Sequence, residues 1–282
     1  MLRLLQQELR SRRNGIIGWA IGLSLLPAIY VAMYPQFQDS LAGMQDILDM
    51  EIYKAMGMSF GTFEDWLAST VINLVPLILA IYAVLDATGT LAGEEDNGKL
   101  ELILALPIKR WQIVTVKAIA HAIALFLILL IVDIVTTIVF LGIESQVETS
   151  LTAWDVFWSL LYLWPIVMAF GMISLFLGTF APSRRVAALI ATVVVIVSYF
   201  GNNLSSQIST LESIKPLFLY NYLHATATLW VDGPQVNDVL VSLGVAMAVF
   251  LLAVVFFQRR DITVGAWPWQ RGKIPADAVR TA

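Results

Sequence analysis

Hydrophobic and polar positions alternate along the chain on the scale of whole helices. Long apolar runs with one charge or none are separated by polar connections. A helix that crosses a bilayer needs about 20 mostly apolar residues. Six runs meet this length, at residues 15–34, 66–92, 118–143, 156–181, 186–207 and 239–257. The pattern predicts an all-α integral membrane protein with six transmembrane helices.

The segments outside these runs are short. The first fourteen residues, MLRLLQQELRSRRN, place Leu2, Leu5 and Leu9 on one helical face and polar side chains on the others. Such a segment is typical of a short helix that lies in the membrane interface before the first span. We therefore expect residues 1–262 to form one six-helix domain and residues 263–282 to form a short cytoplasmic tail.

Basic residues gather on one side of the predicted bundle. Fifteen of the 17 lie in the N-terminal stub, the second and fourth connections, and the C-terminal tail, which leaves only Lys54 and Lys215 for the other side. Connections rich in Lys and Arg face the cytoplasm. Both termini are therefore predicted to be cytoplasmic.

Composition supports the same class and excludes several others. The chain is 59% hydrophobic and 13% charged, whereas ordinary globular domains are about half apolar and a quarter charged. The net charge of −4 is spread along the chain and gives no support for nucleic-acid binding. The absence of cysteine excludes disulfides and thiolate metal sites. No residues have the spacing of zinc ligands or of a nucleophile with its base, so we expect neither a metal site nor catalysis in this chain.

Residues 93–100, GEEDNGKL, match the first seven positions of the phosphate-binding motif G-x-x-x-x-G-K-[ST]. That motif needs a Ser or Thr hydroxyl for magnesium and bare backbone N–H groups for phosphate. Here Leu100 replaces the hydroxyl, and Glu94, Glu95 and Asp96 would repel a polyanion. The chain is therefore not expected to bind ATP.

The same stretch begins a connection of 25 residues, 93–117, which we call the elbow. After a break at Asn97–Gly98 its apolar positions follow helical spacing: Leu100, Ile103, Leu104 and Pro107. Proline suits the first turn of a helix, so Pro107 is predicted to open the next one. The elbow is either an interfacial linker or a docking surface for a soluble partner, since a simple turn needs only a few residues.

The elbow resembles the signature of type-two ABC exporter permeases, E-x-E-x-G-T-L-E-x-L-L-x-x-P-x-x-R followed by a lysine. The matching residues are Glu94, Gly98, Leu100, Glu101, Ile103, Leu104, Pro107, Arg110 and Lys117. The sequence departs from the pattern at Lys99, where Thr is usual, and at Ile103, where Leu is usual. Residues 256–262, FFQRRDI, resemble the arginine–aspartate ending that follows the last span in that family.

The resemblance implies a permease that moves a substrate across the cytoplasmic membrane of a prokaryote. It would pair with a second permease subunit, identical or different, and dock on cytoplasmic ATPase subunits, expected in two copies. ATP and magnesium would bind those partners, and no cofactor would bind this chain. The implied docking residues are Glu94, Glu95, Gly98, Lys99, Leu100, Glu101, Ile103, Leu104, Pro107 and Arg110.

Asp86 and Asp133 are the carboxylates that lie well inside the predicted spans. Such residues usually face a bundle interior or an aqueous path, so both are candidates for the translocation path, and Asp133 is also a candidate for pairing between helices. Asp86 could instead reach water near the cytoplasmic boundary. An alternative function is an ion-coupled secondary transporter that uses both carboxylates, and another is a membrane assembly without substrate flux.

Two further features concern packing. His121, one turn after Lys117, is interpreted as an interface residue. Two pairs of glycines have the spacing G-x-x-x-G, Gly18 with Gly22 and Gly89 with Gly93, which lets helices approach closely.

Overall fold

The computed structural model describes residues 1–43, 61–100, 107–205, 208–223 and 225–259. Six helical segments in these ranges are long and apolar enough to cross a membrane: Leu2–Gln38, Phe63–Thr90, Arg110–Gln146, Ala153–Phe180, Arg184–Ser205 and Val236–Arg259. The described residues contain no β-strand. The six-helix, all-α prediction is confirmed.

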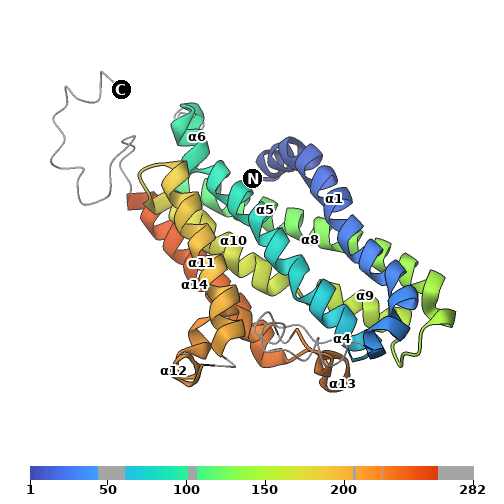
Figure 1. The fold of residues 1–282 in the computed structure, drawn as a ribbon. Coiled ribbons are helices and arrows are strands. Elements are labelled where there is room, and N and C mark those ends of the chain that lie inside the picture. The colour runs from blue at the N-terminus through green and yellow to red at the C-terminus, as the bar shows by residue number, and fades with distance from the viewer. Residues whose placement is uncertain (44–60, 101–106, 206–207, 224, 260–282) are drawn as a thin grey trace.

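The long helices lie alongside one another, with the N-terminus and α6 at one end of the bundle and α12 and α13 at the other (Figure 1). The long elements are α1 (Leu2–Gly43), α5 (Leu74–Thr90), α8 (Arg110–Ile143), α10 (Trp164–Phe180), α11 (Arg184–Ser205) and α14 (Val236–Arg259). The short α-helices are α4 (Phe63–Leu67), α6 (Ala92–Asp96), α9 (Ala153–Leu161), α12 (Ser209–Glu212) and α13 (Thr228–Asp232). A π-helical turn, η1 (Ala68–Ile72), joins α4 to α5, and the 3₁₀ turns are η2 (Glu144–Gln146), η3 (Lys215–Leu217) and η4 (Leu219–Tyr222).

The N-terminal segment is helical, as predicted, but it is not a separate helix. α1 runs without interruption through 42 residues, a length of about 63 Å at 1.5 Å per residue. The hydrocarbon core of a bilayer is only about 30 Å thick. Glu8 and Arg12 form an i,i+4 ion pair just before the expected boundary at residue 14, and such pairs favour helix. α1 therefore reaches well beyond one face of the membrane.

The interior of the bundle is centred on α5. Along this helix Val75, Leu79 and Ala83 are fully buried. α5 packs mainly against α10 and also against α11, whereas α1 packs mainly along α8 and contacts α5 at few positions. At the end of the bundle opposite α6, α1 is held by the indole N–H of Trp66, which donates to the carbonyl oxygen of Tyr30 over 3.0 Å. α1 is thus held to α4 at this end, whereas it meets α5 at few positions along its length.

Candidate functional site

The first part of the elbow ends in a helix cap. Asn97 follows the last residue of α6, and its side-chain amide donates to the carbonyl oxygen of Gly93 over 2.6 Å. Gly98 has φ of 68°, a left-handed conformation that glycine adopts without the strain of a Cβ. The break predicted at Asn97–Gly98 is therefore present in the structure.

The second part of the elbow differs from the prediction at Pro107. This residue lies in a bend, and α8 begins three residues later at Arg110, so Pro107 does not occupy the first helical turn. Lys109, in extended conformation, is the N-cap, and its backbone N–H donates to Oε1 of Gln112 over 3.1 Å. A side chain that satisfies this N–H fixes the start of the helix here.

The predicted docking residues do not share one exposed face. Gly98, Lys99 and Pro107 are exposed, whereas Glu95 and Leu100 are buried. Glu94 and Arg110 are half-buried. Three others lie outside the described residues: Glu101, Ile103 and Leu104. Among the described part of the elbow, the exposed positions flank the segment 101–106.

The start of the elbow meets the start of α1 and the first turns of α8 in a cluster of buried and half-buried ionisable side chains. We call it the ion cluster, and its members are Glu8, Arg12, Asp86, Glu94, Lys117 and His121. They come from four helices: α1, α5, α6 and α8. The cluster thus ties the elbow to the body of the bundle.

Lys117 forms the outer half of the ion cluster. Its side chain is 1% exposed, and its Nζ lies 2.9 Å from Oε1 of Glu8 and 2.7 Å from Oε1 of Glu94. A buried charge is stable only when it is paired and hydrogen-bonded. Lys117 meets that condition by sharing its ammonium between α1 and α6.

Asp86 forms the inner half. Nε of Arg12 donates to both of its carboxylate oxygens, over 3.0 and 3.2 Å, and Nδ1 of His121 lies 2.7 Å from Oδ2. Arg12 also pairs with Glu8, so the two halves are continuous. Asp86 is therefore ion-paired within the bundle, and a path role for it stays a prediction.

His121 is fully buried within the bundle, and its depth relative to the membrane interface stays a prediction. Its ring stacks on Tyr82 with an interplanar angle of 9°. On α10, Gly171 leaves room for it, since a Cβ there would lie 2.1 Å from Nε2 of His121. The imidazole is thus held by a carboxylate, an aromatic ring and a glycine from two other helices.

Glu94 and His121 each have one buried polar atom without a hydrogen-bond partner among the described residues, and for His121 this atom is Nε2. In Glu94, Oε1 accepts from Lys117, but Oε2 is buried without a hydrogen-bond partner among the described residues. Burial raises the pKa of Glu94, although Lys117 acts in the opposite direction. Its side chain is 22% exposed, against 13% for Glu8. The ionised form of Glu94 is therefore less stabilised than that of Glu8, the other carboxylate that pairs with Lys117.

A family model described as ABC-2 family transporter protein matches residues 2–262, almost the whole chain. The chain belongs to this ABC-2 transporter family. The recognition made from the elbow is therefore correct, and the protein is a transmembrane permease of the ABC transporter type. A search of curated proteins found no match to the chain.

Asp133 is the second carboxylate that the sequence singled out in this ABC-2 permease. It is fully buried in α8, and neither of its carboxylate oxygens has a hydrogen-bond partner among the described residues. The hydroxyl of Thr137, one turn further on, is buried and equally without such a partner. Asp133 thus lies in the interior of the bundle, and a path role stays a prediction.

The two glycine pairs of the permease have different surroundings. Gly89 and Gly93 lie under the side chain of Arg184, where a Cβ would come within 3.2 Å of it. The guanidinium donates to the carbonyl oxygen of Leu85, and the backbone N–H of Arg184 donates to Oδ2 of Asp96 over 3.1 Å. Gly89 and Gly93 therefore leave room for the side chain of Arg184. The hydrogen bond from Arg184 to Asp96 connects α11 to α6.

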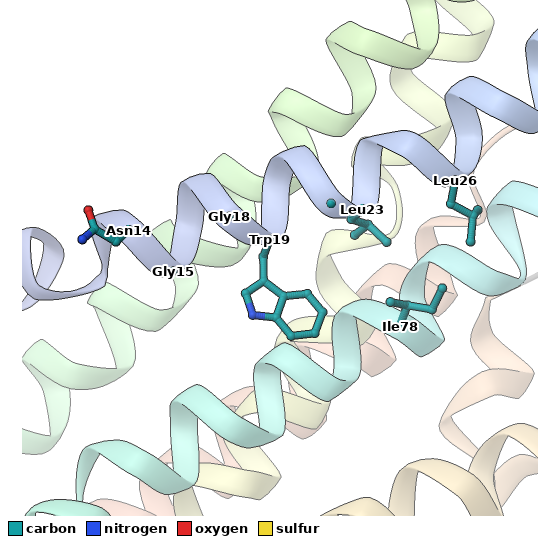
Figure 2. Close-up of a pocket in the computed structure, with 8 residues that line it drawn as sticks. Asn14, Gly15, Gly18, Trp19, Leu23, Leu26 and Ile78 are labelled. Atoms are coloured by element: carbon teal, nitrogen blue, oxygen red, sulfur yellow. The ribbon is translucent and has the colours of Figure 1, made fainter.

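A Cβ on Gly18 or Gly22, by contrast, would have no atom within 4 Å. These glycines line an open groove of about 470 Å³ between α1 and α5, with Ile78 on the α5 side (Figure 2). Trp19 extends from α1 toward α5, and its ring centroid lies 5.7 Å from that of Tyr82 (Figure 2). The predicted close helix approach is absent here among the described residues.

Sequence reasoning missed Glu8 and Arg12 as members of the site. Both were assigned to an interfacial helix because they precede the first apolar run. A signal was available in the sequence. Glu8 and Arg12 have the i,i+4 spacing of an ion pair, and the second and third predicted spans each carry a single carboxylate. An isolated intramembrane acid calls for a basic partner, and Arg12 is that partner for Asp86.

Proposed function

We propose that this ABC-2 permease is the membrane subunit of an exporter in which a separate cytoplasmic ATPase docks on the elbow. The family supplies the transporter class. The observation that supports ATPase coupling is the construction of the elbow. Its half-buried Glu94 and buried Lys117 form an ion pair, whereas Gly98, Lys99 and Pro107 are exposed. A force applied to the exposed positions would reach the bundle through the buried ones.

The proposed complex has two permease and two ATPase subunits, and ATP and magnesium bind only to the ATPase. The elbow faces the cytoplasm, in keeping with the fifteen basic residues on its side. The proposed location is the cytoplasmic membrane of a prokaryote. Substrate moves outward, as in the exporters whose elbow signature this chain resembles.

The structure bears on the ion-coupled alternative through Asp86. A carboxylate that binds a transported ion has to be free in one state, whereas Asp86 is paired with Arg12 and His121. In the arrangement described here, Asp133 is the carboxylate of the two that has no hydrogen-bond partner among the described residues.

The direct test is to purify the chain in mild detergent and to identify any soluble protein that accompanies it. We expect a P-loop ATPase in stoichiometric amount, with ATP hydrolysis that responds to substrate. Leu104→Asp, in the part of the elbow with helical spacing, should abolish this association without preventing membrane insertion. Lys215→Glu, in a connection on the opposite side of the predicted bundle, is the control and should leave it intact.

Two outcomes would contradict the proposal. The first is a chain that purifies alone under every detergent condition. The second is an ATPase whose association and activity are unchanged by Leu104→Asp. Flux driven by a proton or sodium gradient, and lost in Asp133→Asn, would establish the ion-coupled alternative instead.

A further inference from the structure

A second groove lies between α11 and α14, in the half of the bundle away from the elbow. It has a volume of about 610 Å³, and the side chains that line it are mostly apolar. α11 contributes Val193 and Val197, α14 contributes Val241 and Val245, and α10 contributes Ile173. α11 and α14 both pack on α10 but scarcely contact each other. The groove is the space that this arrangement leaves between them.

The 3₁₀ turns η3 and η4 form the rim of this groove, and α11 fixes them in place. The backbone N–H of Tyr220 donates to Oγ of Ser198 over 3.0 Å. A Cβ on Gly201 would lie 2.5 Å from the ring of Phe218, so the ring packs against α11 only because a glycine is there. The rim therefore has a defined position at the end of the groove.

The groove is open sideways, toward the surrounding bilayer, because Val193, Val197 and Leu217 are exposed. It extends from the rim to Val245, which is nine residues along α14 from Val236, or about 14 Å at 1.5 Å per residue. One leaflet contributes about 15 Å, half of the hydrocarbon core of a bilayer. The groove thus has the depth of one leaflet and is accessible to an acyl chain of that leaflet.

Lys215 lies at the rim, immediately before the residues 216–219 that line the groove. Its carbonyl oxygen accepts a hydrogen bond from the backbone N–H of Phe218 over 3.0 Å, which fixes the backbone in η3. Lys215 is half-buried and forms no ion pair among the described residues. An ammonium group at the end of an apolar groove, at the level of the membrane interface, is complementary to the phosphate of a lipid headgroup.

We propose that this groove binds one anionic phospholipid of the leaflet opposite the elbow, with an acyl chain between α11 and α14 and the phosphate at Lys215. A bound acyl chain supplies packing partners to the side chains of α11 and α14 that lack them. The ammonium of Lys215 selects a lipid with net negative charge. This inference is independent of the proposed function, because the site lies away from the elbow and needs no ATPase.

Native mass spectrometry of the delipidated, full-length chain in mild detergent measures the binding. The probes are dioleoylphosphatidylglycerol, which is anionic, and dioleoylphosphatidylcholine, which has the same acyl chains and no net charge. We expect one tightly bound phosphatidylglycerol per chain and weaker binding of phosphatidylcholine. Lys215→Met should weaken the binding of phosphatidylglycerol about fivefold, the effect of one interfacial basic residue. Lys99→Met, at an exposed lysine of the elbow, is the matched control and should have no effect.

Val197→Trp tests the binding of the acyl chain, because an indole at this exposed position would fill the groove without entering the core of the bundle. It should weaken the binding of both lipids by at least about tenfold, the loss expected for two buried methylenes. Val255→Trp is the matched control, since Val255 is exposed on α14 and does not line the groove. A phosphatidylglycerol with a diazirine in one acyl chain should cross-link to residues 193–197 or 241–245 of the parent chain.

The proposal is overturned if Lys215→Met binds phosphatidylglycerol as Lys99→Met does, or if phosphatidylcholine binds to the parent as tightly as phosphatidylglycerol. Equal affinities of Val197→Trp and Val255→Trp would also contradict it. A dimer that Val197→Trp converts to monomer, with no loss of lipid, would show that a second copy of the chain covers the groove instead. If Val197→Trp does not fold, the cross-linking of the parent decides, and labelled residues outside the groove would contradict the proposal.

Discussion

Lys117→Met is expected to be the most destabilising single change in the ion cluster. Methionine fills the same space, but it leaves the carboxylates of Glu8 and Glu94 close together without the ammonium that pairs with both. Removing one partner of a buried ion pair lowers stability by about 3–5 kcal/mol. Thermal unfolding of the detergent-solubilised chain, followed by tryptophan fluorescence, would measure the loss.

The control for this change is Lys99→Met, the same substitution at an exposed lysine of the elbow. Surface changes of this kind usually alter stability by less than about 0.5 kcal/mol. The double variant Lys117→Met with Glu94→Gln should recover part of the loss, since it removes the stranded charge of Glu94, whereas Glu8 keeps Arg12 as a partner. Equal melting temperatures for the two single Lys→Met variants would show that the ion cluster does not stabilise the fold.

Gly171→Ala is expected to be the second most damaging change, although it adds a single methyl group. That carbon would lie 2.1 Å from Nε2 of His121, so the imidazole would have to leave its place against Asp86 and Tyr82. Overpacking of this kind costs about 1–3 kcal/mol. The unfolding temperature of the purified chain would report it.

The matched control is Gly244→Ala in α14, where no atom lies within 4 Å of the new Cβ. This change should stabilise the chain by up to about 1 kcal/mol, because alanine is the better helix former. In the double variant Gly171→Ala with His121→Ala the two losses should not add, because the clash disappears with the ring. Full additivity would mean that Gly171 acts on the fold by some other contact.

The spans could be predicted from the sequence because each is a local property. Twenty or so apolar residues in succession satisfy the bilayer regardless of their neighbours, and all six were found. The continuity of α1 was missed because the pattern changes from amphipathic to apolar near Asn14, and a change of pattern resembles a boundary. The ion pairs that hold residues 8 and 12 in place are properties of the folded bundle.

The ion cluster itself could not be predicted from spacing, because its partners are far apart in the chain. Arg12 and Asp86 are separated by 74 residues, and Glu8 and Lys117 by 109. Which of several charges meet depends on the rotation of each helix about its own axis. Asp133 shows the opposite case, since its position within the apolar run was enough to place it in the interior.

The order of the ion cluster along the chain has a consequence for biosynthesis. A nascent chain emerges from its N-terminus, so Glu8 and Arg12 are made first and can neutralise each other as neighbours on α1. Asp86 and Glu94 then add two carboxylates, and no further basic member of the cluster exists until Lys117 and His121 are synthesised. A polypeptide released before α8 therefore has Arg12 as the one basic member of the ion cluster for three carboxylates, Glu8, Asp86 and Glu94. Synthesis of α8 supplies Lys117 and His121, the remaining partners of these carboxylates.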